Sequence, residues 1–174
     1  MIFNKLNAGR GYNLIDEEGW LNVDTELRGV KENFRLWDIT KAPNTLEHDL
    51  TERFDFILLN HVLCTMNYHN VHQALINIHR SLKPNGKLQV IDMDLEKAIN
   101  AYSNNRPELI PIEEGSIDYK MCMHISSYGT RYSLYTVPVM QQVLKEAGFR
   151  ETKKMYHSEF DSRPNESLIV EATK

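Results

Sequence analysis

Short apolar runs alternate along this chain with segments in which apolar residues recur at helical spacing. The strand-like runs lie at residues 2–7, 20–24 and 54–59, and the last of these is the most apolar stretch of the sequence. A helix is predicted over residues 68–83, where apolar positions repeat every three or four residues until the turn Pro84-Asn85-Gly86 ends it. This alternation predicts an α/β fold, with a largely parallel sheet and helices on both of its faces.

The second half of the chain continues the pattern. Residues 87–92 are predicted as a strand, residues 95–102 and 140–147 as helices, and Gly148 is suited to end the second of these helices. Residues 149–156 and 167–172 are expected to close the sheet as an antiparallel hairpin, joined by the turn-forming residues 161–165. Residues 104–136 have weak periodicity, and we interpret them as a variable insertion over one edge of the sheet that carries specificity.

The length and composition fit a single folded domain. The 174 residues lie within the usual range for one domain, about 100–200 residues, so we treat residues 1–174 as one unit. The apolar runs are far shorter than the roughly 18 residues that span a bilayer, so no membrane segment is expected. A net charge of −4 gives no general attraction to phosphate backbones, which makes nucleic acid an unfavoured partner.

The cysteines indicate a reducing location. Cys64 and Cys122 form no C-x-x-C pair, and the N-terminus lacks a basic and apolar leader. We therefore expect a cytoplasmic protein without cysteine-based zinc sites. His69, His72 and His79 fall on one predicted helix, but no acid or cysteine close to them in the sequence completes a ligand set, so no metal site is predicted.

The first candidate binding element is a glycine-rich turn directly after the first predicted strand. Gly9 and Gly11 stand one residue apart, which lets the backbone turn sharply and brings its N–H groups close to a ligand. A plain turn explains the same two glycines equally well. A dinucleotide-binding turn has a third glycine where this chain has Leu14, so NAD and FAD are disfavoured as cofactors.

Acidic and polar residues follow the next predicted strands. Asp24 ends the strand 20–24, where a carboxylate can hold the two hydroxyls of a ribose, although an isolated acid at such a place is more often a surface residue. Asp38 follows a third strand-like segment, and His61 follows the strand 54–60. In an open parallel sheet the carboxyl ends of the strands share one rim, so these residues and the glycine turn are expected to converge there.

In their order and spacing, these segments resemble the class I S-adenosylmethionine-dependent methyltransferases. The resemblance implies a single Rossmann-like sheet of seven mostly parallel strands with the last strand antiparallel. It also implies S-adenosylmethionine as the cofactor, lying across the ends of strands one to four, and transfer of its methyl group to a small-molecule or protein acceptor. The segments that carry the resemblance are Leu6-Asn7-Ala8-Gly9-Arg10-Gly11, Gly19-Trp20-Leu21-Asn22-Val23-Asp24, His61-Val62-Leu63, Arg80-Ser81-Leu82-Lys83-Pro84-Asn85-Gly86 and Lys145-Glu146-Ala147-Gly148-Phe149.

The resemblance also implies roles for individual residues. The glycine turn would face the methionine moiety, Asp24 the ribose hydroxyls and Asp38 the adenine, while the backbone near Asn60 and the side chain of His61 would border the methyl group. The implied cofactor-binding residues are Asn7, Ala8, Gly9, Arg10, Gly11, Asp24, Asp38, Ile39, Asn60 and His61.

The chain departs from the family pattern at several positions. Arg10 stands where the family usually has a small residue, and its guanidinium could either pair with the cofactor carboxylate or cross the pocket. Cys64-Thr65 replaces a frequent Glu-His, and Asn77 replaces a frequent Glu. The alternative interpretation is therefore a catalytically degenerate member of the family that acts as a cofactor-binding or scaffold partner.

Candidate catalytic groups come from a strand end and from the insertion. His61 would border the methyl group, while Tyr119 and His124 belong to an aromatic-rich part of residues 104–136 that could form an acceptor pocket with His124 as base. Packing of the same residues over the edge of the sheet is an equally good explanation. Methyl transfer needs alignment above all, and it needs a base only when the acceptor is an alcohol or a protonated amine.

Overall fold

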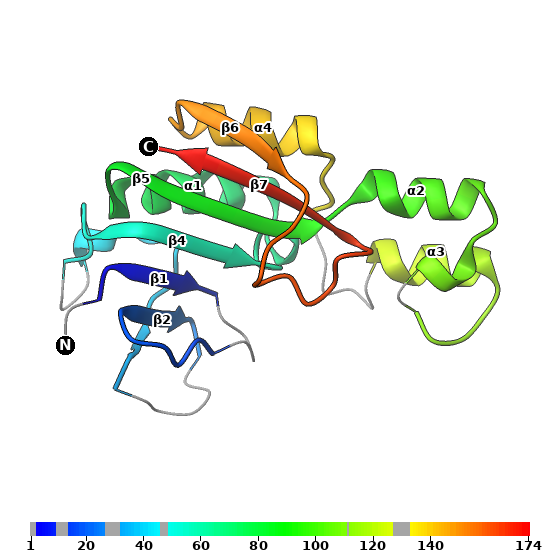
Figure 1. The fold of residues 1–174 in the computed structure, drawn as a ribbon, viewed down its shortest axis with the longest axis horizontal. Helices are drawn as coiled ribbons and strands as arrows, with labels where there is room; N and C mark the ends of the chain where they lie inside the picture. The colour runs from blue at the N-terminus through cyan, green and yellow to red at the C-terminus, as the bar shows by residue number, and fades with distance from the viewer. Residues whose placement is uncertain (1–2, 10–13, 27–31, 46–48, 111, 127–132) are drawn as a thin grey trace.

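A single mixed sheet organises the fold (Figure 1). The computed structural model describes residues 3–9, 14–26, 32–45, 49–110, 112–126 and 133–174. Seven strands of these residues form the sheet in the order β3-β2-β1-β4-β5-β7-β6. They are β1 (Lys5–Ala8), β2 (Trp20–Asp24), β3 (Phe34–Leu36), β4 (Phe54–Asn60), β5 (Leu82–Met93), β6 (Glu151–Met155) and β7 (Ser167–Thr173).

The strand directions follow the sequence-based prediction. Neighbouring strands from β3 to β5 pair in parallel, and β7 lies antiparallel between β5 and β6. The expected α/β class, with a mostly parallel sheet of seven strands and an antiparallel last strand, is confirmed. The helices are α1 (Tyr68–Ser81), α2 (Leu95–Ser103), α3 (Ile117–Ser126) and α4 (Val137–Glu146), with short 3-10 helices η1 (Pro43–Thr45), η2 (Leu63–Thr65) and η3 (Pro107–Leu109).

Helix α1 forms where the apolar period predicts it. The Asn67 side chain begins the helix by accepting a hydrogen bond from the Asn70 N–H at 3.0 Å. The apolar stripe of the helix, including Val71 and Leu75, is fully buried against the sheet. The helix ends at Ser81, two residues earlier than predicted, and β5 follows without a connecting loop.

The turn Pro84-Asn85-Gly86 therefore lies inside β5 instead of before it. Pairing with β4 jumps from the pair Phe54–Leu82 to the pair Phe56–Lys87, so the turn is accommodated as an irregularity near the start of the strand. Asn85 has a φ of +64°, a left-handed conformation that asparagine tolerates better than most residues. The predicted strand at residues 87–92 is thus the regular part of a longer strand.

The two faces of the sheet are covered in different ways. Helices α1 and α4 lie behind the sheet in Figure 1 and enclose the larger apolar core against it. On the other face, Trp20, Leu58, Ile91 and Ile169 form a smaller cluster, which is packed against Phe160 and other partly buried apolar residues from loops and strands. Among the described residues, loops and strands cover this second face.

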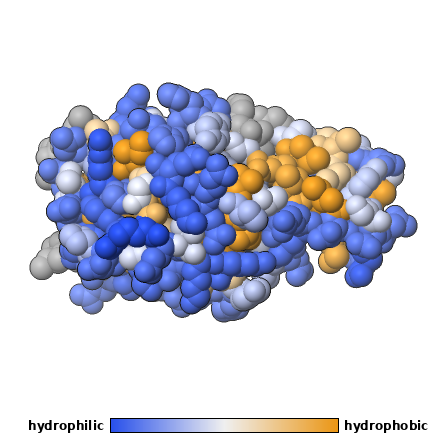
Figure 2. Space-filling view, turned by 90° about the horizontal axis from the view of Figure 1, so that it is seen from above, coloured by the Kyte–Doolittle hydropathy of each residue, from blue (hydrophilic) through white to orange (hydrophobic). Residues whose placement is uncertain are grey.

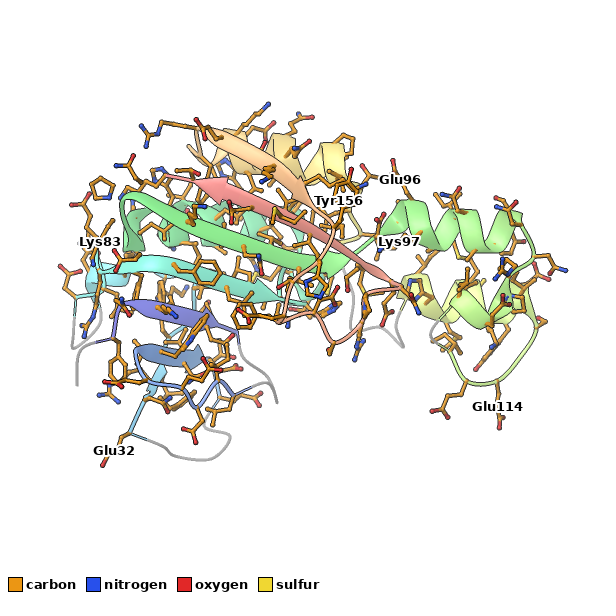
Figure 3. The ribbon with its side chains drawn as sticks, viewed as in Figure 1. Glu32, Lys83, Glu96, Lys97, Glu114 and Tyr156 are labelled. Atoms are coloured by element: carbon orange, nitrogen blue, oxygen red, sulfur yellow. The ribbon has the colours of Figure 1, made fainter. Side chains whose placement is uncertain are left out.

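Helices α2 and α3 project beyond the sheet as a pair (Figure 1). The Tyr102 hydroxyl donates a hydrogen bond to Asp118 at 2.7 Å and joins the two helices. Lys97, at the start of α2, donates to the carbonyls of Pro164 at 2.8 Å and Ser167 at 2.6 Å, which ties the pair to the loop before β7 (Figure 3). Helix α3 lies within the predicted insertion 104–136 and packs on α2.

This helix pair carries exposed apolar side chains. Figure 2 shows an apolar patch toward the end of the molecule that the pair forms. The exposed large apolar side chains of the two helices include Ile99, Tyr102, Tyr119 and Ile125. Every helix of the described residues is too short or too polar to cross a membrane.

Lowering the pH is expected to destabilise the fold through His79. The His79 ring packs edge-on against Phe149, with ring centroids 5.1 Å apart, and burial lowers the pKa of His79 below its ordinary 6.5, with the positive charge of Lys174 adding to the effect. The unfolded chain then binds the proton more readily, so stability is complete above about pH 6.5 and falls as the pH drops through the lowered pKa. Urea unfolding at about pH 7.5 and about pH 5.5 should show a smaller loss of stability for His79→Gln than for the parent.

The exposed residue His157 provides the matched control for this measurement. His157→Gln should keep the parent's pH dependence. An unchanged pH dependence in His79→Gln would show that other groups control acid stability.

Candidate active site at the carboxyl ends of the strands

Strand register brings the predicted site residues to one rim. Ala8 pairs with Val23 on one side and with Leu59 on the other, so β1, β2 and β4 end at the same level. Asp24 pairs with Leu36 of β3, which extends the rim by one more strand. Gly9, Asp24 and Asn60 therefore stand in a row across three neighbouring strands.

Gly9 makes a tight turn possible at the centre of this rim. Its φ is +70°, in the left-handed region that favours glycine, and its N–H donates to the Val23 carbonyl at 2.9 Å. A Cβ atom at this position would lie 2.8 Å from both γ-carbons of Val62. The glycine is therefore required by backbone conformation and by close packing. Arg10 and Gly11, the other predicted members of this turn, lie outside the described residues.

Gly9→Ala is expected to destabilise the fold by about 1–3 kcal/mol, because the alanine would be held in a strained conformation and would clash with Val62. Urea unfolding measures the loss.

Gly148→Ala separates the two causes, since Gly148 also has a positive φ of +103° but its Cβ would come no closer than 3.6 Å to a neighbour. The double variant Gly9→Ala, Val62→Ala should recover part of the loss. A Gly9→Ala protein as stable as the parent would contradict this account of the turn.

A cavity of about 280 Å³ opens beside Gly9. Its lining residues come from the ends of β1, β2 and β3 and from the turn that follows β4. Five of the predicted site residues line it, namely Gly9, Asp24, Asp38, Ile39 and His61, together with Thr25, Trp37, Val62, Thr65 and Met66, which the sequence-based reasoning missed. We call this cavity the rim pocket.

Two carboxylates set the chemistry of the rim pocket. Asp24 Oδ1 accepts the Thr25 N–H at 2.7 Å, and Asp38 Oδ1 accepts the N–H and the hydroxyl of Thr40 at 2.9 and 2.8 Å. No other hydrogen bond to the Asp38 carboxylate is formed within the described residues, so its Oδ2 is available to a ligand. The described lining residues include no lysine or arginine, so this pocket suits the hydroxyl and amino groups of a nucleoside better than phosphates.

The segment that carries Asp38 is anchored to helix α1. Asn77 is fully buried, and its side-chain amide donates to the Ile39 carbonyl at 2.9 Å. The Trp37 indole N–H donates to the Lys41 carbonyl at 3.1 Å. Asn77 stands where the related family often has Glu, and the structure gives it a positioning role beneath the rim pocket.

His61 has an unusual backbone conformation at the edge of the rim pocket. Its φ is +53°, which is uncommon for a residue other than glycine and is frequent at functional sites. Its N–H donates to the Ile91 carbonyl at 2.8 Å, and its Nε2 lies 3.4 Å from the Ser167 hydroxyl. The strand end and β7 together fix the ring next to the rim pocket.

A buried polar group lies behind His61. Asp92 is fully buried, and its two carboxylate oxygens accept the backbone N–H groups of Cys64 at 3.0 Å and Met93 at 2.8 Å. His61, Cys64 and Asp92 each offer one ligand atom within 4.8 Å of the others. Asp92 ends the predicted strand 87–92, so its position at the rim was available from the sequence, but its proximity to Cys64 was not.

Tyr135 is buried next to this polar group, close to Asp92 and Cys64. The residue is 3% exposed, and its hydroxyl has no hydrogen-bond partner among the described residues. Burial raises the pKa of Tyr135 to about 12, and the neighbouring charges of Asp92 and Cys64 add to the rise. Ser133 lies close enough to offset part of this effect, but its own hydroxyl is bonded to the Met66 carbonyl at 2.8 Å.

A second cavity, of about 330 Å³, lies on the face of the sheet that carries the smaller apolar cluster. Asn7 and Asn60 line it together with the loop residue Phe160. Asn60 donates to the Phe160 carbonyl at 2.8 Å, and its side-chain oxygen is buried without a hydrogen-bond partner among the described residues. Strand alternation places these amides on the opposite face from Ala8, which is buried in the larger core.

The two candidate catalytic residues of the insertion lie on α3. Tyr119 is 49% exposed, and His124 is 2% exposed. Neither side chain lines the rim pocket or the second cavity. The structure thus brings His61 to the rim pocket and leaves Tyr119 and His124 in the helix pair. Within the described residues, the histidines of α1 belong to no group of three potential metal ligands.

Comparison with known proteins gives the family. Residues 9–154 match the family model described as "Methyltransferase domain". The chain belongs to this methyltransferase family. The resemblance drawn from the sequence is confirmed, and with it methyltransferase as the class of enzyme and S-adenosylmethionine as the cofactor of that class. A search of curated proteins gave no match.

Solved structures show the same fold at low sequence identity. A SAM-dependent methyltransferase from Archaeoglobus fulgidus is 15% identical with a TM-score of 0.64, and the match covers 99% of this chain and 86% of that one. The 1,6-didemethyltoxoflavin-N1-methyltransferase of Burkholderia thailandensis, solved with its substrate and S-adenosylhomocysteine, is 18% identical with a TM-score of 0.58, covering 98% and 70%. The citrinin polyketide synthase CMeT domain is 14% identical with a TM-score of 0.60, and the match covers 98% of this chain but 46% of that one. The chain spans about half the length of several such structures.

Proposed function

We propose that this protein binds S-adenosylmethionine across the rim and transfers its methyl group to a small-molecule acceptor. The observation that carries the proposal is the convergence of Gly9, Asp24, Asp38, Ile39 and His61 on one pocket. These residues come from four separate strand ends, and they are five of the ten that the family resemblance selects for the cofactor.

The rim pocket suits the nucleoside part of the cofactor. The Asp24 carboxylate can accept hydrogen bonds from the two ribose hydroxyls, and Asp38 can accept one from the adenine amino group. Ile39 and the buried Trp37 supply apolar surface for the base. S-adenosylmethionine carries no phosphate, which agrees with a pocket that presents two carboxylates.

The second cavity suits the methionine part of the cofactor. The buried Asn60 oxygen without a partner is a hydrogen-bond acceptor, and the ammonium group of methionine is a donor. In the order of strand ends, Gly9 stands between Asp24, which lines the rim pocket, and Asn60, which lines the second cavity, so one extended ligand could cross the turn between them. This assignment places the sulfonium centre near the turn.

Methyl transfer is an in-line displacement, so the protein's main task is alignment. The acceptor atom attacks the methyl carbon as the bond to the sulfonium sulfur breaks, and that sulfur keeps the electron pair. His61 is the candidate base for an acceptor that must lose a proton, because its ring borders the rim pocket. A small-molecule acceptor is favoured because the B. thailandensis relative methylates one.

Isothermal titration with S-adenosylmethionine and S-adenosylhomocysteine tests the proposal. We expect binding at one site per chain. A parallel titration with 5′-methylthioadenosine, which lacks the amino acid part, should show weaker binding if the second cavity holds the methionine moiety. No heat signal at millimolar ligand would overturn the proposal in favour of a degenerate scaffold protein. Methyl incorporation into protein but not into small molecules would redirect it to a protein acceptor.

A further inference from the structure

We propose that His61, Cys64 and Asp92 form a binding site for a divalent ion of the zinc type beside the rim pocket. The proposed methyl transfer gives no role to Cys64 or Asp92, and His61 would act as a base there only while no ion is bound. The site departs from the sequence-based expectation, which excluded cysteine-based zinc sites because no second cysteine lies nearby in the sequence.

The ligand atoms have the chemistry and the spacing that zinc takes. An imidazole nitrogen, a thiolate sulfur and a carboxylate oxygen are its three common protein ligands. The three atoms lie within 4.8 Å of one another, and in a tetrahedral site with bonds of about 2.0–2.3 Å they would stand about 3.5 Å apart. Closing that difference needs only small side-chain adjustments.

Hydrogen bonds hold the carboxylate ready for an ion. Asp92 is fully buried, and each of its oxygens accepts one backbone N–H, from Cys64 and from Met93. Such bonds fix the orientation of the carboxylate. Cys64 is 3% exposed, so its sulfur is held in the same protected place.

The Ser167 hydroxyl is a hydrogen-bonding neighbour of the His61 ring. Ser167 Oγ lies 3.4 Å from His61 Nε2, and it is itself held by Asp161 at 3.0 Å and by the Arg163 carbonyl at 2.9 Å. A histidine that binds an ion typically has its other ring nitrogen hydrogen-bonded to a neighbouring group, so Ser167 can hold the ring in place.

The Tyr135 hydroxyl is the independent sign of a missing partner. It is buried beside Asp92 and Cys64 without a hydrogen-bond partner among the described residues. A water molecule or acceptor group on the fourth position of the ion would supply that partner. Three protein ligands with one open position are typical of catalytic zinc, which lowers the pKa of the group that it binds.

Cobalt titration of the chelator-treated protein tests the site. Thiolate ligation of Co²⁺ gives a charge-transfer absorption in the near ultraviolet, and we expect it to saturate at one ion per chain and to be displaced by Zn²⁺. The Cys64→Ser variant should lose the absorption, and His61→Ala should bind Co²⁺ about tenfold more weakly or worse. Cys122→Ser is the matched control, because Cys122 is the exposed cysteine on α3, and it should behave as the parent does.

The outcomes of these titrations distinguish failure of the metal site from failure of the proposed cofactor site. Circular dichroism checks that the Cys64→Ser protein is folded, and His61→Ala gives a second reading at a residue that is only half-buried. Absorption that survives Cys64→Ser, is lost in Cys122→Ser or never develops would overturn the metal site. Titration of the chelated protein with S-adenosylhomocysteine reports the cofactor site independently, so either proposal can fail while the other stands.

Discussion

Asp24→Ala is expected to weaken the binding of S-adenosylmethionine about tenfold to hundredfold. The two ribose hydroxyls would lose their charged acceptor, and hydrogen bonds to a charged group contribute about 1.5–3 kcal/mol. Asp24 ends β2 at the rim pocket, and its carboxylate accepts hydrogen bonds from the N–H and the hydroxyl of the adjacent Thr25. Circular dichroism of the variant distinguishes a loss of ligand affinity from a loss of folding. Isothermal titration of the parent and the variant measures the loss of affinity.

The matched control for this prediction removes the same charge at the opposite end of a strand. Asp55 lies near the start of β4 and pairs with Lys83 on the surface, with Nζ 2.9 Å from the carboxylate. Asp55→Ala should bind the cofactor as the parent does, because an exposed ion pair contributes little. An Asp24→Ala protein that folds normally and keeps full affinity would show that the ribose lies elsewhere.

Asn22→Ala is expected to destabilise the fold by about 2–4 kcal/mol. Asn22 is fully buried in β2, and its side chain accepts the Asn7 amide at 2.9 Å and the Ile15 N–H at 3.0 Å while donating to the Ile15 carbonyl at 2.8 Å. Alanine would leave several buried polar groups without this partner, and each costs about 1–3 kcal/mol, partly offset by relaxation. Urea unfolding with an unchanged slope would confirm a pure stability effect.

Asn100, exposed on α2, is the control for the Asn22 prediction. Asn100→Ala should change stability by less than about 0.5 kcal/mol. The double variant of Asn7 and Asn22 should cost less than the sum of the two single changes, because the pair shares a hydrogen bond. Additive losses would show that the two amides act separately.

The sequence predicts most of the sheet and much of the rim. Strands and helix α1 follow from apolar periodicity, because burial of one face leaves a regular pattern in the chain. Asp24, Asp38 and His61 were found because each follows a strand, and parallel strands end on a common rim. These predictions depend on the periodicity of apolar residues along the chain and on the rule that parallel strands end on a common rim.

Other features of the site depend on contacts that no local pattern records. The left-handed backbone of His61 is imposed by the strand end and by η2, and histidine gives no signal for it. The same holds for the group formed by Cys64, Asp92 and Tyr135, whose members come from three separate segments. Helix α3 was not predicted because its apolar residues follow no clear period, and it packs mainly on α2.

The loop between β6 and β7 covers a buried aromatic side chain and also lines the second cavity. Phe160 of this loop packs on Trp20, with ring centroids 5.4 Å apart, and the same residue lines the second cavity with Asn60. If this loop moved away from the sheet, the Trp20 indole would become exposed and the second cavity would lose part of its lining at the same time. A ligand held there adds its binding free energy to the closed state, so hydrogen exchange across this face should slow in proportion to occupancy.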